Sequence, residues 1–389
     1  MYILIFILIL SLLIFVHEFG HFIVARKSGM KVYEFGFGYP PRAIGVYRDP
    51  KTKKLVWVTR KKSKSTLKNT VGGAEKEEEY PATLYTINWL PLGGFVKIKG
   101  ENGEKVKDTD SFGYHKFWKK ALVLIAGVTM NFLLAAVLLG FGFMVGLPAD
   151  AELLKDKRAI IVEEPAVMVQ QVVEDSPAEA AGLAFGDKII KIDEEEVEDT
   201  EMLISYVTQH GNDSISLLVL KNGETMALSV IPQQLDPEDT PKIGVILADA
   251  GIIRYPWYIA LYKGFVAAAI AVVNILIAFY FLIKNLVMGQ GLAFSVAGPV
   301  GIAVIVGDSA KLGFSYLINV TAMLSLSLAV LNILPIPALD GGRLVFVIIE
   351  RVFKKPVPLK YEQAAHTVGF LLLMLLIVVV TWRDVAKLF

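Results

Sequence analysis

The sequence contains no cysteine and almost no excess of charge of either sign. Its 39 Lys and Arg residues face 38 Asp and Glu residues, which leaves a formal net charge of +1. Without cysteine no disulfide can form and no thiolate can attack a substrate, so any metal must be held by His, Asp or Glu. The balanced charge gives no basic excess of the kind that binds nucleic acid, and we expect no nucleic-acid partner.

Apolar residues, in contrast, are abundant. They make up 54% of the 389 residues, and the mean hydropathy is +0.54, too apolar for a soluble globular protein of this length. Four stretches approach or exceed the roughly 20 apolar residues that cross a bilayer core. We therefore predict a mainly α membrane protein embedded in a lipid bilayer. Its four transmembrane helices are expected at residues 1–26, 121–147, 314–342 and 364–382.

The segment between the first two predicted spans, residues 27–120, has the pattern of a β-hairpin region. Short runs of strand-forming residues alternate with Gly and Pro turns. The expected strands are Lys31–Phe37, Leu55–Thr59, Thr83–Trp89 and Phe95–Lys99. The strongly charged stretch Lys61–Glu79 is interpreted as a solvated loop.

Residues 159–233 have the composition of an ordinary soluble α+β domain. Strands are expected at Met168–Val173 and Lys188–Ile192, and a helix at Thr200–His210 with Thr200 as its N-cap. The Asn222-Gly223 step predicts a hairpin near the end of this segment. Its size and the central run SPAEAAGLAFGDKIIKID resemble a bacterial PDZ domain. Binding of a peptide is not indicated, because Glu163–Ala166 lacks a glycine-rich carboxylate loop.

The strongest motif is His17-Glu18-Phe19-Gly20-His21, at the end of the first apolar run. Four residues are just over one helical turn, so both imidazoles project from one face and can chelate one ion, with Glu18 placed to accept a proton from water. Unpaired ionisable groups at the end of an apolar helix are costly in a membrane, so residues of this kind are functional candidates by default. A harmless helix end in interfacial water is the alternative interpretation.

A zinc ion needs a third protein ligand. Asp340 is the best candidate, because it follows an apolar span that is broken by two prolines and precedes Gly341 and Gly342. Irregular backbone at membrane depth occurs only where it lines a cavity or packs in protein. The other histidines, His115, His210 and His366, lie in the loop, the soluble domain and the mouth of the last span.

The motifs HEFGH, NILPIPALDGG, EFGFG and LYTINWLPLGGFVKIKGE, with one PDZ-like domain between them, resemble the site-2 protease family, in particular its bacterial regulator-of-sigma-E type. The resemblance covers nearly the whole chain. It implies that His17, His21 and Asp340 hold Zn²⁺ and that Glu18 is the catalytic base. It also implies that Asn332 binds the substrate backbone or the developing oxyanion. The family's second span usually reads Gly-Pro-x-x-Asn, but this chain has Gly127-Val128-Thr129-Met130-Asn131, so Asn131 is expected to be a packing or support residue.

Lysine and arginine near the span ends predict the orientation. Basic residues follow the first span, precede the second and lie between the last two. Those segments are expected on the cytoplasmic side of an inner (plasma) membrane, with the PDZ-like domain outside. The active site would then lie near the cytoplasmic face.

Residues 257–310 complicate this topology. One extra crossing there would put Asp340 on the opposite side from HExxH, so we expect interfacial or re-entrant helices, with a second extra crossing near Ser295–Val306 as the alternative.

The sequence predicts an intramembrane zinc metalloendopeptidase that cleaves transmembrane segments of other proteins, such as anti-sigma factors or signal-peptide remnants. A strand in the Thr83–Lys99 region could hold the unwound substrate by strand addition. Two alternatives remain: a metal-ion transporter, and an inactive membrane-tethered PDZ adaptor. The first does not explain Glu18 beside His17.

Overall fold

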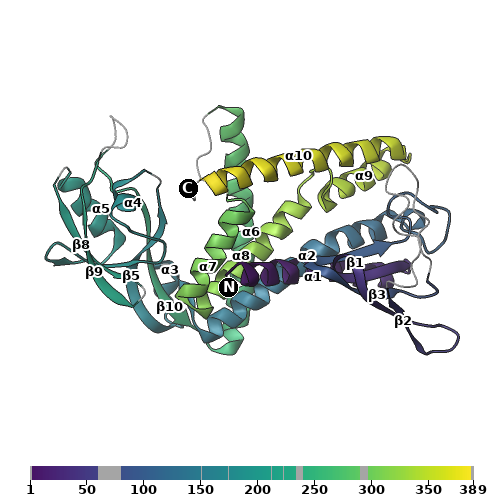
Figure 1. Ribbon diagram of the computed structural model, residues 1–389, viewed down its shortest axis with the longest axis horizontal. Coiled ribbons are helices and arrows are strands. Elements are labelled where there is room, and N and C mark those ends of the chain that lie inside the picture. Colours follow the sequence, from purple (N-terminus) through teal and green to yellow (C-terminus); the bar gives the residue numbers. More distant parts are fainter. Residues whose placement is uncertain are drawn as a thin grey trace. The chain divides into compact units, whose positions relative to one another are not determined.

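The computed structural model (Figure 1) describes residues 2–59, 80–149, 151–173, 175–211, 213–221, 223–233, 240–289 and 297–386. The predicted solvated loop, Lys61–Glu79, and Asn222 of the predicted hairpin lie outside these ranges. The longer helices are α1 (Tyr2–Lys27), α2 (Phe117–Val145), α5 (Thr200–Gln209), α6 (Trp257–Val287), α7 (Pro299–Leu312), α8 (Phe314–Ile333), α9 (Asp340–Phe353) and α10 (Leu359–Ala386). Three short helical segments are η2 (Phe112–Tyr114), α3 (Ala151–Leu154) and α4 (Pro177–Ala180).

The chain divides into two compact units. The first comprises residues 1–135, 268–304 and 321–389, and the second comprises residues 136–267 and 305–320. A buried cluster in the first unit joins α1, the neighbouring sheet, α2 and α9 through apolar side chains that include Phe22, Val32, Val123 and Val347. All the residues predicted to carry chemistry belong to this first unit.

The sheet of the first unit contains β1 (Val32–Arg48), β2 (Leu55–Thr59) and β3 (Leu84–Ile98) in the order β2-β1-β3. The predicted strands of residues 27–120 lie within these elements or overlap them. Gly36 of β1 is opposite both Phe95 and Thr86, so the first part of β1 lies between the two halves of β3. Helix α1 packs against β3 where the Ser11 hydroxyl hydrogen-bonds with the Pro91 carbonyl and the Gly93 amide.

The second unit contains the PDZ-like region. Its strands are β4 (Leu147–Ala149), β5 (Ile160–Val172), β6 (Lys188–Ile192), β7 (Glu195–Glu196), β8 (Ile215–Lys221), β9 (Glu224–Val230) and β10 (Val245–Arg254). They form one sheet in the order β4-β10-β5-β6-β8-β9, with β7 paired to β6. The sheet therefore continues beyond the expected limits 159–233, because β10 pairs along β5. The predicted N-cap Thr200 is wrong: Asp199 caps α5 by accepting a hydrogen bond from the Met202 amide.

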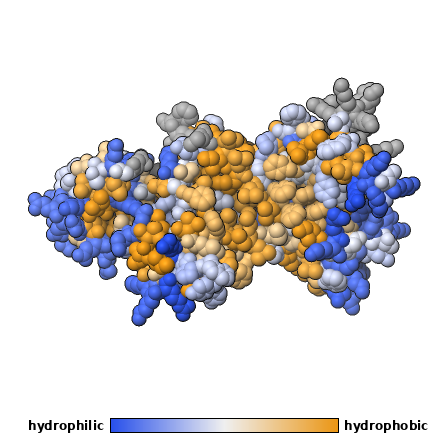
Figure 2. Space-filling view, turned by 90° about the horizontal axis from the view of Figure 1, so that it is seen from below, coloured by the Kyte–Doolittle hydropathy of each residue, from blue (hydrophilic) through white to orange (hydrophobic). Residues whose placement is uncertain are grey.

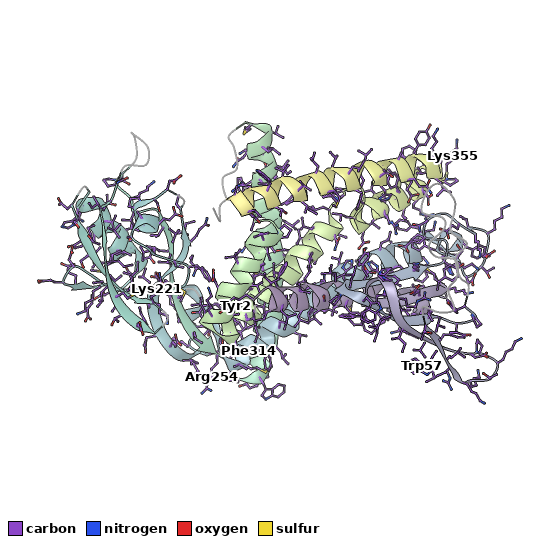
Figure 3. All side chains as sticks on the ribbon, viewed as in Figure 1. Tyr2, Trp57, Lys221, Arg254, Phe314 and Lys355 are labelled. Carbon is purple, nitrogen blue, oxygen red and sulfur yellow. The ribbon has the colours of Figure 1, made fainter. Side chains whose placement is uncertain are left out.

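Five helices among the described residues are long and apolar enough to cross a membrane: α1, α2, α6, α8 and α10. Four of them match the predicted spans. The most apolar windows of α6 and α10 are each only 6% buried, so these helices present hydrophobic surface outward. Figure 2 shows a broad hydrophobic region on the surface, as expected of a protein that faces lipid. Exposed Trp57 on β2 (Figure 3) adds an aromatic side chain of the type found at membrane interfaces.

Helix α6 is continuous over 31 residues, whereas α7 has only 14. At 1.5 Å per residue, α7 is about 21 Å long and is too short for a hydrocarbon core of about 30 Å. The interfacial or re-entrant arrangement of residues 257–310 stays a prediction.

Candidate metal centre

Helix α1 carries the first two donor groups. His17 and His21 are one turn apart and both are buried, and their Nε2 atoms lie 3.1 Å from each other. The helix forms because residues 2–16 are aliphatic or aromatic apart from one serine, with no glycine or proline. It ends after Lys27, where Gly29 adopts a left-handed conformation with φ 86°. The histidine face is thus set by an unbroken helix.

The tautomer of His21 follows from its second nitrogen. Nδ1 lies 2.7 Å from the backbone carbonyl of Val123, and because a carbonyl can only accept, Nδ1 must carry the hydrogen. The Nε2 lone pair of His21 is therefore free to bind a metal. A hydrogen bond of this kind also orients a metal-binding imidazole.

Asp340 reaches the two histidines from the far end of the sequence. Its Oδ2 atom lies 2.9 Å from His17 Nε2 and 3.2 Å from His21 Nε2. Helix α8 ends at Ile333 because Pro335 and Pro337 cannot continue its hydrogen bonding. The turn that follows places Asp340 at the start of α9.

This turn, residues 334–339, is held by close contacts with α9 and α10. A Cβ at Gly341 would collide with the Leu334 carbonyl oxygen, and one at Gly369 of α10 would collide with that of Pro337. Ala338 has a left-handed φ of 82°, which is unfavourable for a residue with a side chain. Its backbone N–H donates a 2.8 Å hydrogen bond to Nδ1 of His366. The aspartate is thus positioned by contacts that leave no room for side chains.

The three donors fit a zinc ion. A tetrahedral zinc with bonds of about 2.0–2.1 Å separates its ligand atoms by about 3.3 Å, and the observed separations are 2.9, 3.1 and 3.2 Å. Two imidazole nitrogens and one carboxylate oxygen are ligands that zinc accepts. Helix α2 contributes Gly127, where a Cβ would lie 2.5 Å from His21 Nε2 and 2.7 Å from His17 Nε2. Only glycine leaves this space open.

A cavity of about 270 Å³ adjoins the donor group. Glu18 lines it together with His17 and Asp340. Asn332, in the last turn of α8, also lines the cavity, and so does Asn131 of α2. The structure thus brings together all five residues that the sequence assigned to chemistry: His17, Glu18, His21, Asn332 and Asp340.

Two contributors were not predicted from the sequence. Gly127 was seen only as part of a motif variant, and nothing in its immediate sequence signals a contact with His17 and His21. His366 was set aside as a ligand candidate, and its structural contact is with the turn before Asp340 instead. His366 and Gly369 are three residues apart and so lie on one face of α10, but their contacts with the turn could be recognised only from the structure.

An apolar, multi-helix chain whose HExxH histidines meet a distant aspartate beside a cavity has the features of a membrane zinc metalloprotease. The model of peptidase family M50 matches residues 5–53 and 74–376, and the chain belongs to this family of site-2 proteases. The chain is accordingly a zinc metalloprotease with Zn²⁺ as its metal. The predicted resemblance is confirmed, and the ion-transporter alternative is not supported.

Similarity to individual proteins extends along the whole chain. It is 32% identical to a protein of Clostridium perfringens (strain 13 / Type A), over 99% of this chain and 98% of the relative. It is 29% identical to the regulator of sigma-W protease RasP of Bacillus subtilis (strain 168), over 99% and 98%. Among solved structures, the PDZ domain of the SdrC-like protein Lin2157 from Listeria innocua covers 21% of this chain and 92% of its own, with 28% identity and a TM-score of 0.20.

Proposed function

We propose that this protein hydrolyses peptide bonds within transmembrane segments of other membrane proteins, as in regulated intramembrane proteolysis of anti-sigma factors or signal-peptide remnants. The observation that supports this most is the placement of His17, His21 and Asp340 on or beside apolar helices. A protease whose donor group is built into such helices is suited to substrates in the bilayer.

In this proposal His17, His21 and Asp340 are the protein ligands of zinc. A bound zinc ion supplies a Lewis acid that makes water nucleophilic at neutral pH and stabilises negative charge on the substrate carbonyl oxygen. The hydrogen bond from His21 Nδ1 to Val123 fixes one imidazole. Gly127 keeps the space between the donors clear.

Glu18 is the proposed general base. It follows His17 directly and lines the same cavity as Asp340. Its carboxylate accepts the proton of the attacking water and then donates it to the amine nitrogen that leaves when the C–N bond breaks. Both transfers use one side chain, so the carboxyl group returns to its starting state after each cleavage.

Asn332 is proposed to bind the substrate. Its amide group lines the cavity from the last helical turn before the broken segment. An amide N–H can donate to the carbonyl oxygen on which negative charge develops. The same group can instead hold the substrate backbone before reaction, as the sequence already suggested.

A transmembrane helix hides its carbonyl groups in its own hydrogen bonds, so a substrate must unwind before cleavage. We propose that β3 holds the opened segment by strand addition. Residues 94–98 pair with β1 on one side and with no second strand among the described residues, which leaves an edge for another chain. This edge belongs to the strand that packs against α1.

We propose an inner (plasma) membrane location with four crossings by α1, α2, α8 and α10. The basic residues near the span ends favour a cytoplasmic active site and an external PDZ-like region. Because α1 and α8 both lead to the donor group, they must run the same way through the bilayer. An interfacial or re-entrant α6 and α7 satisfies this requirement.

The test is cleavage by purified protein of a fluorescence-quenched peptide with about 20 apolar residues and a central Gly-Gly step. Wild type should cleave it, a chelator should stop cleavage, and added Zn²⁺ should restore it. Asp340→Ala should neither retain about one zinc per chain nor cleave. Cleavage that survives complete zinc removal would refute the proposal, and zinc binding without cleavage would favour the inactive adaptor.

A further inference from the structure

The side chain of Asn131 is buried, polar and without a partner. Its relative exposure is 0%, and neither its Nδ2 nor its Oδ1 atom has a hydrogen-bond partner among the described residues. Buried amide groups are hydrogen-bonded in the great majority of proteins, and an unpaired one lowers stability.

Asn131 lines the cavity beside the donor group. It is one helical turn beyond Gly127, whose Cα faces the two imidazoles, so both residues are on the same face of α2. It lines the cavity that Glu18 and Asn332 also line. The backbone carbonyl of Asn131 accepts a 2.8 Å hydrogen bond from the Ser325 hydroxyl of α8, which fixes this turn of α2 against α8.

A packing role explains these observations poorly. Leucine has nearly the same shape as asparagine and would fill the same space between α2 and α8 without burying two unpaired polar atoms. The backbone bond from Ser325 does not depend on the Asn131 side chain at all. The carboxamide therefore contributes nothing to the fold that an apolar residue would not contribute better.

We propose that the Asn131 carboxamide binds a backbone peptide group of the unwound substrate beside the scissile bond. A carboxamide offers one acceptor oxygen and an N–H donor, which matches the C=O and N–H of an extended peptide. Only an unwound segment has these groups free, so Asn131 selects for backbone that has left the helix. Asn332 and Asn131 then hold the segment from two different helices.

This inference rests on the proposed function, and binding can be measured separately from cleavage. In a Glu18→Gln background the dissociation constant for the quenched Gly-Gly peptide reports binding without turnover. Adding Asn131→Leu should weaken this binding about ten-fold, and in the active protein it should lower kcat/KM by about 10–100-fold. Zinc per chain should be unchanged, and Tm without peptide should stay equal or rise because two unpaired polar atoms are removed.

Thr129→Val is the matched control. Thr129 lies on the same helix, is exposed, and donates its hydroxyl only to the Ile125 carbonyl of its own helix, so binding and cleavage should not change. Asn131→Ala tests the same loss without leucine's bulk and should also weaken binding. Equal peptide affinity with and without Asn131, or a fall in both Tm and zinc content in the Leu and Ala variants, would overturn the inference. Failure of the proposed function would appear differently, as wild type that binds the peptide and zinc but never cleaves.

Discussion

At the scale of single residues, three donor atoms from two ends of the chain lie within 3.2 Å of one another. Their orientation also depends on uncharged groups of α2 that contribute no donor atom. The Val123 carbonyl fixes the His21 ring, and Gly127 provides the empty space in front of both rings. The donor set thus relies on backbone groups of α2 as well as on its own side chains.

Gly127→Ala tests this dependence. The new Cβ would lie 2.5 Å from His21 Nε2, closer than unbonded atoms approach, so the donors or α2 must move. Zinc affinity should fall about ten-fold or more although every ligand remains. Metal content after dialysis against a graded chelator series measures this. Gly140→Ala on the same helix, where the nearest atom would be 3.3 Å away, should bind zinc normally. Wild-type zinc affinity in Gly127→Ala would contradict the assignment.

The residue scale is also where the sequence was most informative. The geometry of HExxH can be predicted from its spacing, because residues four apart place both imidazoles on one helical face. Asp340 could be predicted because prolines and glycines beside a carboxylate are unusual within an apolar stretch. The contact of Gly127 with the histidines and the unpaired carboxamide of Asn131 could not be predicted, because both depend on which face of α2 meets α1. That packing is a tertiary property.

At the scale of elements, the turn between α8 and α9 determines where Asp340 lies. Ala338 adopts a left-handed conformation, which costs of order 1 kcal/mol or more for a residue with a Cβ and persists only when neighbours impose it. Helix α10 imposes it twice, through the hydrogen bond from Ala338 N–H to His366 and through the contact of Gly369 with Pro337. Helix α10 thus supports the position of Asp340, although α10 contributes no donor atom itself.

His366→Leu should therefore weaken zinc binding about ten-fold, although His366 is not a ligand. His366→Asn should preserve most of the affinity, because Oδ1 of asparagine occupies nearly the position of Nδ1 and can accept the same hydrogen bond. Competition with a fluorescent zinc chelator gives the affinities. Thr367→Val, next to it on the exposed side, serves as control. Equal losses in the Leu and Asn variants would show that His366 acts by bulk alone.

Among the elements, α6 shows where sequence reasoning reached its limit. Its hydropathy predicts an apolar segment, which Lys263 and Lys284 interrupt. The structure shows one uninterrupted helix from Trp257 to Val287. Length alone does not distinguish a tilted crossing from a helix in the interface, because helices of about 20–30 residues occur in both settings.

At the scale of the whole molecule, the residues proposed for zinc binding and catalysis all lie in one compact unit and the PDZ-like sheet lies in the other. The PDZ-like unit has its own buried core, which includes Val167, Ile192, Leu203 and Val219. Its sheet extends beyond the predicted limits 159–233, because β10 follows a polar stretch that is expected, from the sequence, to end the domain. Only strand pairing shows that β10 belongs to the same sheet.

We predict that the PDZ-like region regulates substrate choice and takes no part in the chemistry. Replacing residues 159–254 by a short linker should leave about one zinc per chain. Substrates with large external domains should then be cleaved several-fold faster relative to short ones, because a size filter has been removed. Paired cleavage assays on one transmembrane segment with and without a fused external domain measure the ratio. If the zinc-loaded truncated protein loses activity on both substrates in equal proportion, the filter hypothesis is wrong.

The central claim is that Glu18 moves the proton in a zinc-dependent cleavage, and one substitution tests it most directly. Glu18→Gln keeps the shape of the side chain but cannot accept a proton from water. We predict that purified Glu18→Gln holds about one zinc per chain and retains the wild-type Tm. Its cleavage of the quenched transmembrane peptide should fall by at least about 100-fold. Cleavage near the wild-type rate by the zinc-loaded variant would contradict the account.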